Sequence, residues 1–241
     1  MKTALCLSGI VGGTGGRNSY GGDADYALCS EHFKKYVIEP NNCDVFIHSW
    51  SVEHKENLIK LYEPRASSFE PQIDFSPSGT KPDIHLKASK FRFRSKWYSV
   101  AQSIKLLEGY ENYDWVIVSR FDLMFLQTLD LSKLDNTKLY APNYSTFPKD
   151  SGRERWEFPQ KCNVSLHKPI IHDFYYIASY DNIVKLVSSE PEDWFYHTTA
   201  NPHKANRARI LSVGLLDIVD YWGHRGYEYD LYRWRIGKCK Q

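Results

Sequence analysis

The chain has 241 residues, of which 42% are hydrophobic and 25% charged, and its formal net charge is +2. A chain of this length can bury a large core, so it needs neither disulfides nor a structural metal to fold. The near-zero net charge gives no support to a nucleic-acid partner, and we expect none.

The cysteines and the apolar runs of the sequence indicate the cellular compartment in which the protein is expected. The chain has 5 cysteines, an odd number, and none has the C-x-x-C spacing of zinc sites, so free thiols in a reducing compartment are expected. No stretch has the apolar core of a signal peptide or the roughly 20 apolar residues of a membrane helix. We therefore expect a cytoplasmic protein without a transmembrane segment.

The first half of the chain alternates buried strands with amphipathic helices. A glycine-rich loop is expected over residues 9–22, directly after the first strand, and a proline-rich loop over 64–85. In chain order, we expect a strand at 3–8, a helix at 23–39, a strand at 44–48, helices at 51–63 and 86–109, and a strand at 115–119.

The second half continues this alternation around a long insertion, an irregular excursion over 142–169 that is rich in proline and polar residues. The expected elements are strands at 138–141 and 174–178 and helices at 181–188 and 205–221. Alternating strands and helices predict an α/β fold with a mostly parallel, Rossmann-like sheet and helices on both faces. We expect one domain over 1–241, with a nucleotide half at 1–125 and a substrate half at 126–241.

The end of the strand at 115–119 carries a cation and a carboxylate, Arg120 and Asp122. Strand alternation would place both on one side of the sheet. The carboxylate can hold a divalent ion that bridges a diphosphate, and Arg120 can add direct charge to the phosphates. The residue types equally allow an internal ion pair that only fixes a turn.

The glycine loop offers a second phosphate-binding candidate, because backbone amides without side chains can approach a pyrophosphate closely. Residues Gly12–Ser19 do not match the P-loop pattern, since arginine and asparagine stand in place of lysine and serine or threonine. A P-loop-like sulfotransferase or kinase that depends on Arg17 and Ser19 therefore stays an alternative. A non-catalytic module that binds nucleotides or sugars is another.

Three segments in order resemble those of GT-A-type glycosyltransferases of bacteria and viruses. They are A-L-C-L-S-G at Ala4–Gly9 with Arg17 in the next loop, D-V-F-I-H-S-W at Asp44–Trp50, and K-W-Y-S at Lys96–Ser99 followed by Y-D-W-V-I-V-S-R-F-D-L at Tyr113–Leu123. The resemblance implies a GT-A fold and transfer of a sugar from a nucleotide-diphosphate-sugar donor. The acceptor would be a glycan, a lipid-linked group or a protein.

The resemblance also implies roles for particular residues. Arg120 and Asp122 would hold the diphosphate with Arg17, and Trp50 could stack on the base. The full set implied to bind the donor is Ser8, Gly9, Arg17, His48, Trp50, Lys96, Ser99 and Arg120.

Metal dependence is a conditional expectation. GT-A enzymes usually carry D-x-D, whereas this chain has Arg120-Phe121-Asp122, so Mn²⁺ or Mg²⁺ would bind Asp122 with a late histidine, His203, or its competitor His224. The literal D-x-D at Asp23–Asp25 is expected to begin a helix instead.

Asp173 is the candidate general base, because it precedes a strand on the acceptor half and an inverting transfer needs a base near the acceptor hydroxyl. A retaining transfer needs no such base, and the sequence leaves both outcomes open.

Overall fold

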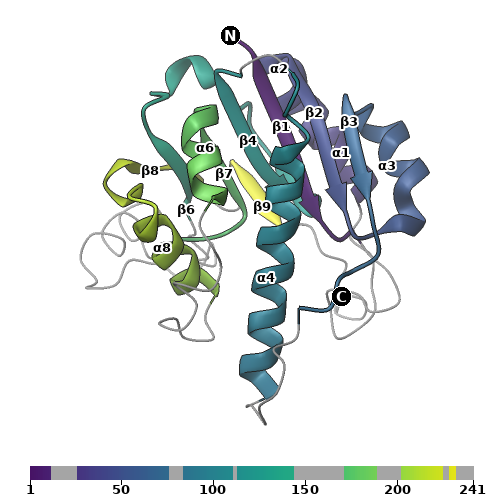
Figure 1. The fold of residues 1–241 in the computed structure, drawn as a ribbon. Helices are drawn as coiled ribbons and strands as arrows, with labels where there is room; N and C mark the ends of the chain where they lie inside the picture. Colours follow the sequence, from purple (N-terminus) through teal and green to yellow (C-terminus); the bar gives the residue numbers. More distant parts are fainter. Residues whose placement is uncertain are drawn as a thin grey trace, which may run out of the picture.

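The computed structural model describes residues 1–11, 26–75, 84–110, 113–143, 171–188, 202–224 and 228–231, with the backbone alone for 84–90, 143, 202–204 and 224. Within these residues, one seven-stranded sheet has helices on both faces (Figure 1). The strand order is β3-β2-β1-β4-β7-β6-β8. A separate two-stranded sheet pairs β5 with β9.

The strands of the large sheet are mostly parallel. Strands β1 to β4 run in one direction, and β7 is antiparallel to both β4 and β6, while β6 and β8 are parallel to each other. The strands are β1 (Thr3–Gly9), β2 (Cys43–Ser49), β3 (Ala66–Phe69), β4 (Trp115–Arg120), β5 (Leu123–Phe125), β6 (Leu139–Asn143), β7 (Tyr175–Ala178), β8 (Val219–His224) and β9 (Tyr229–Leu231).

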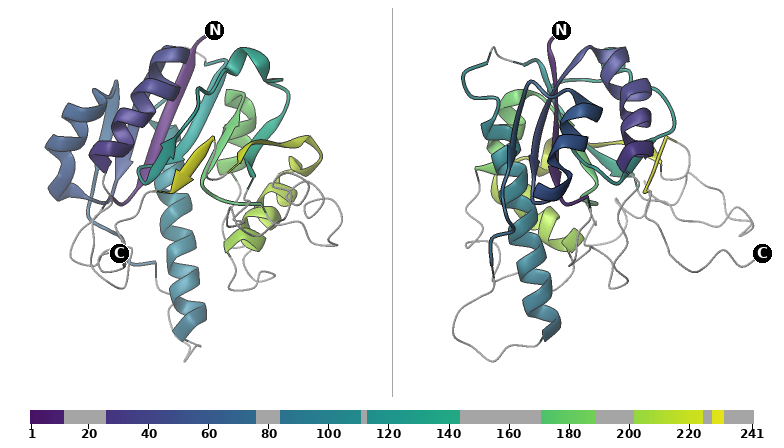
Figure 2. Two further views of the ribbon diagram at one scale, coloured as in Figure 1. Left: turned by 180° about the vertical axis from the view of Figure 1, so that it is seen from behind. Right: turned by 90° about the vertical axis from the view of Figure 1, so that its right-hand side faces the viewer.

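The helices divide between the two faces of the sheet (Figure 2). One face is covered by α4 (Ile84–Lys105), α6 (Tyr180–Val187) and α8 (Pro202–Ser212). The other is covered by α1 (Tyr26–Phe33), which continues through a π-helical turn at Lys34–Ile38 into α2 (Glu39–Asn41), and by α3 (Lys55–Tyr62). Single 3-10 turns lie at Val52–His54, Leu131–Lys133 and Leu216–Ile218.

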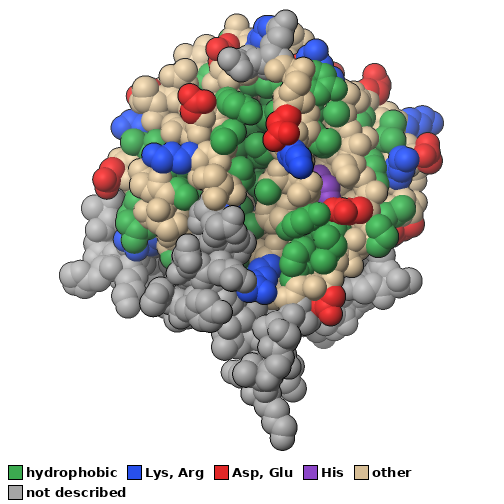
Figure 3. All heavy atoms as spheres, in the orientation of Figure 1, with side chains coloured by type: hydrophobic (Ala, Val, Ile, Leu, Met, Phe, Trp, Pro, Cys, Tyr) green, Lys and Arg blue, Asp and Glu red, His purple; other side chains and the backbone are tan. Residues whose placement is uncertain are grey.

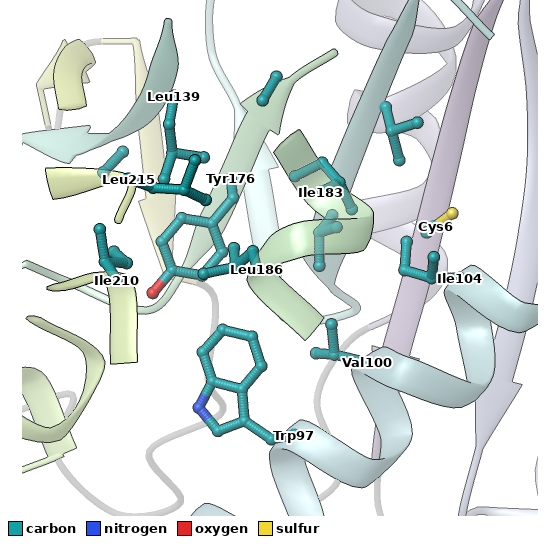
Figure 4. Close-up of a cluster of buried hydrophobic side chains, with 14 of the residues drawn as sticks. Cys6, Trp97, Val100, Ile104, Leu139, Tyr176, Ile183, Leu186, Ile210 and Leu215 are labelled. Atoms are coloured by element: carbon teal, nitrogen blue, oxygen red, sulfur yellow. The ribbon is translucent and has the colours of Figure 1, made fainter. Parts of the chain in front are cut away.

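Strand alternation creates two cores. In β1, Ala4 and Cys6 face the α4 side, whereas Leu5 and Leu7 face the α1 side. A strand that is apolar on both faces is typical of a parallel sheet covered by helices on both sides. Figure 4 shows the first core, in which Trp97 of α4 stacks on Tyr176 of β7, and Val100 belongs to the same cluster.

The long helix α4 is held by one apolar face. Trp97, Val100 and Ile104 are each no more than 4% exposed and follow helical spacing, as predicted, while Ala101 is half-buried. The predicted Leu107 is also buried, but it lies in the turn after the helix, which ends at Lys105. The N-terminal part of α4 projects past the carboxyl ends of the parallel strands (Figure 1). Side chains near its middle therefore stand at the edge of the sheet where β1, β2 and β4 end.

The predicted α/β class, its strands and most helices are confirmed, and two expectations are wrong. Part of the expected loop over 64–85 forms β3, a short serine-rich strand that pairs with β2 at the sheet edge. The expected helix over 205–221 ends at Ser212, because Gly214 adopts a left-handed conformation (φ 68°) and residues 219–224 join the sheet as β8. Among the described residues, no helix combines the length and apolarity that a membrane span requires.

Candidate functional site

The parallel part of the sheet reverses its direction of winding at β1. The chain adds β2 and then β3 on one side of β1, and β4 on the other. Ligands of open α/β sheets bind outside the carboxyl ends of the strands at such a reversal. The ends of β1 and β4, at Gly9 and Arg120, are therefore the place to look for a site.

A polar row crosses the sheet at this edge. Ser8 is in register with His48 on one side and with Arg120 on the other, so the three side chains share one face. That face is the one covered by α4, since His48 contacts Ser99 of that helix. Gly9, with φ 109°, ends β1, and its carbonyl accepts hydrogen bonds from the Trp50 amide and the Ser49 hydroxyl.

Arg120 and Asp122 form a buried bidentate ion pair. The Arg120 Nε donates to one carboxylate oxygen at 2.8 Å and Nη2 to the other at 2.6 Å. Their side chains are 10% and 1% exposed. Burial alone would lower the pKa of Arg120, but the charges of Asp122 and Asp173 raise it above its ordinary value. The guanidinium therefore stays charged at the carboxyl end of β4.

A second ion pair lies beside the first. The Lys96 Nζ donates to Asp173 at 3.0 Å, with the two side chains 17% and 13% exposed. The ammonium also lies 4.8 Å from the centre of the Trp97 ring. Burial lowers the pKa of Lys96 to about 8; the charge of Asp173 opposes this, and Arg120 adds to it. The two pairs thus interact as one group of charges.

His48 links the helix to the next strand end. Its Nδ1 is 2.7 Å from the Ser99 hydroxyl and its Nε2 is 2.9 Å from a carboxylate oxygen of Glu70. Burial lowers the pKa of His48, although Glu70 opposes the shift, so the ring is neutral at pH 7 and Nε2–H donates to Glu70. Ser-His-acid composition is typical of nucleophilic catalysis, but Ser99 is wholly buried. The chain of bonds positions Glu70 and does not expose a nucleophile.

Trp50 is only 5% exposed, because Tyr98 stacks on it at 5.3 Å between ring centres. Its ring is therefore covered in this structure, and Tyr98, which is half-buried, is the aromatic residue nearer to solvent. The sequence predicted a role for Trp50 and not for Tyr98, because the helical pattern of α4 does not show that Tyr98 packs on a residue that follows β2.

Arg209 and Glu70 are further charged residues that the sequence did not indicate. Arg209, buried on α8, donates to the carbonyls of Leu186 and Val187 and lies 4.1 Å from the centre of the Trp97 ring. It fastens α8 to the end of α6, which is a structural role. Glu70 follows the short strand that the sequence analysis assigned to a loop.

Several predicted site residues lie outside the described residues. These are Arg17 with the whole Gly12–Ser19 loop, the pair Asp23 and Asp25, and the side chains of His203 and His224. Of the two metal ligands implied, only Asp122 can be placed, and both of its oxygens accept from Arg120. Within the described part of the chain, no three His, Cys, Asp or Glu side chains gather as a metal site would need.

No protein-family model and no curated protein matches this sequence.

Proposed function

We propose that this protein is a glycosyltransferase that moves a sugar from a nucleotide-diphosphate-sugar to a glycan, a lipid-linked group or a protein. One observation carries the proposal: residues from segments far apart in the chain, which together resemble a GT-A enzyme, converge at one sheet edge. They are Ser8 of β1, His48 of β2, Lys96 and Ser99 of α4, and Arg120 at the end of β4. The mostly parallel sheet is compatible with that fold.

The diphosphate of the donor would bind near Arg120 and Lys96. Both cations are largely withdrawn from water, and an ion pair in such a place is stronger than at an exposed surface. Positive charge fixed before the reaction stabilises the leaving diphosphate without reorganisation. Asp122 holds the guanidinium of Arg120 in place through both of its hydrogen bonds.

A metal ion is not assigned a step in this reaction. An ion bound at Asp122 would lie next to the charged guanidinium of Arg120, and the described side chains form no group of three metal-binding residues, so they do not fit Mn²⁺ or Mg²⁺ as they stand. Arg17, from the segment that carries the resemblance, would add charge to the diphosphate.

Asp173 is the group that would accept the acceptor's proton if the reaction inverts configuration. It is mostly buried but reachable, and Lys96 fixes one of its oxygens at 3.0 Å. In a retaining reaction, Asp173 would serve only to hold Lys96. Product stereochemistry distinguishes these roles.

Thermal shift with and without Mn²⁺ tests the donor class, using UDP-, GDP-, CMP- and dTDP-linked sugars. A ligand at about 100 times its Kd stabilises the folded state by about 2.7 kcal/mol. Stabilisation by one donor, followed by its hydrolysis or transfer, is the expected result. A response to ATP or to the sulfate donor PAPS alone would replace the proposal with the sulfotransferase or kinase alternative, and donor binding without turnover would favour a binding module.

A further inference from the structure

The carboxylate of Glu70 is partly exposed to solvent and is held in place by buried residues. Its backbone amide donates to the Ser49 carbonyl, and its side chain, 33% exposed, accepts from the buried His48. His48 is in turn fixed by Ser99. A charged side chain held by a buried partner loses little freedom when it binds a ligand, which favours recognition.

An aromatic wall stands next to this carboxylate. Tyr98 packs against Trp50 and Phe75, with ring centres 5.3 and 5.5 Å away, and these two rings also contact each other at 6.2 Å. Phe75 also contacts Phe91 at 6.3 Å. Tyr98, Phe75 and Phe91 are half-buried. Figure 3 shows hydrophobic side chains at the surface in this region beside α4, with acidic side chains at their margin. Aromatic rings next to a fixed polar group are typical of small-molecule sites.

Glu70 and Trp50 have hydrogen-bonding groups that the described residues do not fully use. A carboxylate offers about four lone-pair sites, and those of Glu70 receive hydrogen bonds from His48 and Tyr98. The indole Nε1–H of Trp50 is buried without a hydrogen-bond partner among the described residues. A ligand that donates to Glu70 and packs on the rings would use the remaining acceptor sites.

The charge of Glu70 selects the kind of ligand. A phosphate or carboxylate would be repelled at hydrogen-bonding distance, whereas hydroxyl groups donate to a carboxylate in strong, charge-assisted bonds. Glu70 follows β3, three strands from β4, which is about 14 Å at the usual strand spacing. Glu70 is therefore distinct from the Arg120–Asp122 pair, although it contacts His48 of the same polar row.

We propose that Glu70 and Tyr98 form a subsite for the vicinal hydroxyls of a sugar ring, which packs against the aromatic wall. The hydroxyls belong either to the ribose of a nucleotide or to a sugar of the acceptor. The assignment of the subsite to donor or acceptor rests on the proposed function, whereas the chemistry of the subsite does not.

Calorimetric titration distinguishes the two sources. The probes are UDP and GDP, their 2′-deoxy counterparts, and the monosaccharides glucose, galactose and N-acetylglucosamine, each with the wild type, Glu70→Ala, Glu70→Gln and Tyr98→Leu. If the ribose binds here, UDP or GDP binds about tenfold or more tighter than its deoxy form, and the Glu70 variants lose this preference. If an acceptor sugar binds here, a monosaccharide binds the wild type and both Glu70 variants weaken it, with no preference for ribose.

Glu108→Gln is the matched control, because Glu108 is an exposed carboxylate just beyond the far end of α4. Thermal melting checks that each variant folds, and Tyr98→Leu replaces the Glu70 variants if these do not. Affinities for every probe that agree within about twofold between wild type and the Glu70 and Tyr98 variants would overturn the subsite, as would no binding of any probe to the wild type. If nucleotides bind and replacing Arg120 weakens this binding but replacing Glu70 does not, only the subsite is refuted. If monosaccharides bind in a way that depends on Glu70 and no nucleotide binds, only the proposed function is refuted.

Discussion

Replacement of Asp122 by asparagine tests the central ion pair, and its cost can be worked from the geometry. The carboxylate is 1% exposed and accepts two hydrogen bonds from Arg120, so its removal leaves a buried cation without its counter-charge. Breaking a buried pair in this way costs about 3–5 kcal/mol. Asparagine keeps one acceptor oxygen, so we expect about 3 kcal/mol. For a chain of this size, that lowers the melting temperature by roughly 6–12 °C.

A double-mutant cycle separates the pair from its surroundings. In an Arg120→Met background the cation is gone, so Asp122→Asn should cost less than in the wild type, with a coupling of about 1–3 kcal/mol measured by urea or thermal unfolding. Asp130→Asn is the control, since Asp130 is an exposed carboxylate paired with Lys133 and such pairs contribute at most about 1 kcal/mol. A melting temperature for Asp122→Asn within about 1 °C of the wild type, or strictly additive costs, would refute the reasoning.

Four further outcomes are expected. The pKa of Lys96 is lowered from 10.5 to about 8 by burial, so this group binds more protons in the unfolded chain between these values and its contribution to the free energy of unfolding should rise with pH there. Buried thiols and phenols with raised pKa values act in the opposite direction in both proteins, so urea unfolding between pH 8 and 10 should show the rise in the difference between wild type and Lys96→Met. Nucleotide-sugar affinity should fall above pH 8 in the wild type but stay flat in Lys96→Met, measured by calorimetry. Trp97→Ala should cost about 3–5 kcal/mol, because the ring is 2% exposed between β7 and α8; a loss below 1 kcal/mol in urea unfolding would contradict this packing. Burial raises the pKa of Cys43 to about 12 and that of Cys6 further, so peptide mass spectrometry after thiol labelling at pH 8 should find both unmodified until the protein unfolds.

Much of the fold follows from local patterns. The apolar runs in β1, β2 and β4 are buried on both faces, which leaves a continuous signal in the sequence, and the apolar stripe of α4 has clear helical spacing. The strand β3 has serine at Ser67 and Ser68, and its formation depends on pairing with β2 rather than on its own sequence. The reversed direction of β7 likewise depends on its neighbours and not on a local pattern.

The candidate site was predicted in part. The adjacency of Arg120 and Asp122 follows from their position after a strand, although the strand ends at Arg120 and a turn brings the carboxylate back. Glu70, by contrast, is placed by contacts with His48 and Ser49, which are distant in sequence. Contacts of this kind leave no trace in a single sequence.

The central position of β1 has a consequence for synthesis of the chain. β1 can pair with β2 soon after both have emerged, but its other edge pairs with β4, which begins at Trp115. At about 5–20 residues per second, translation needs roughly 5–20 s to cover that interval. During this time an apolar strand edge stays open and can pair wrongly with other chains. The β1–β4 junction, where we propose that the donor binds, is thus completed late, and binding there reports that the long-range pairing has succeeded.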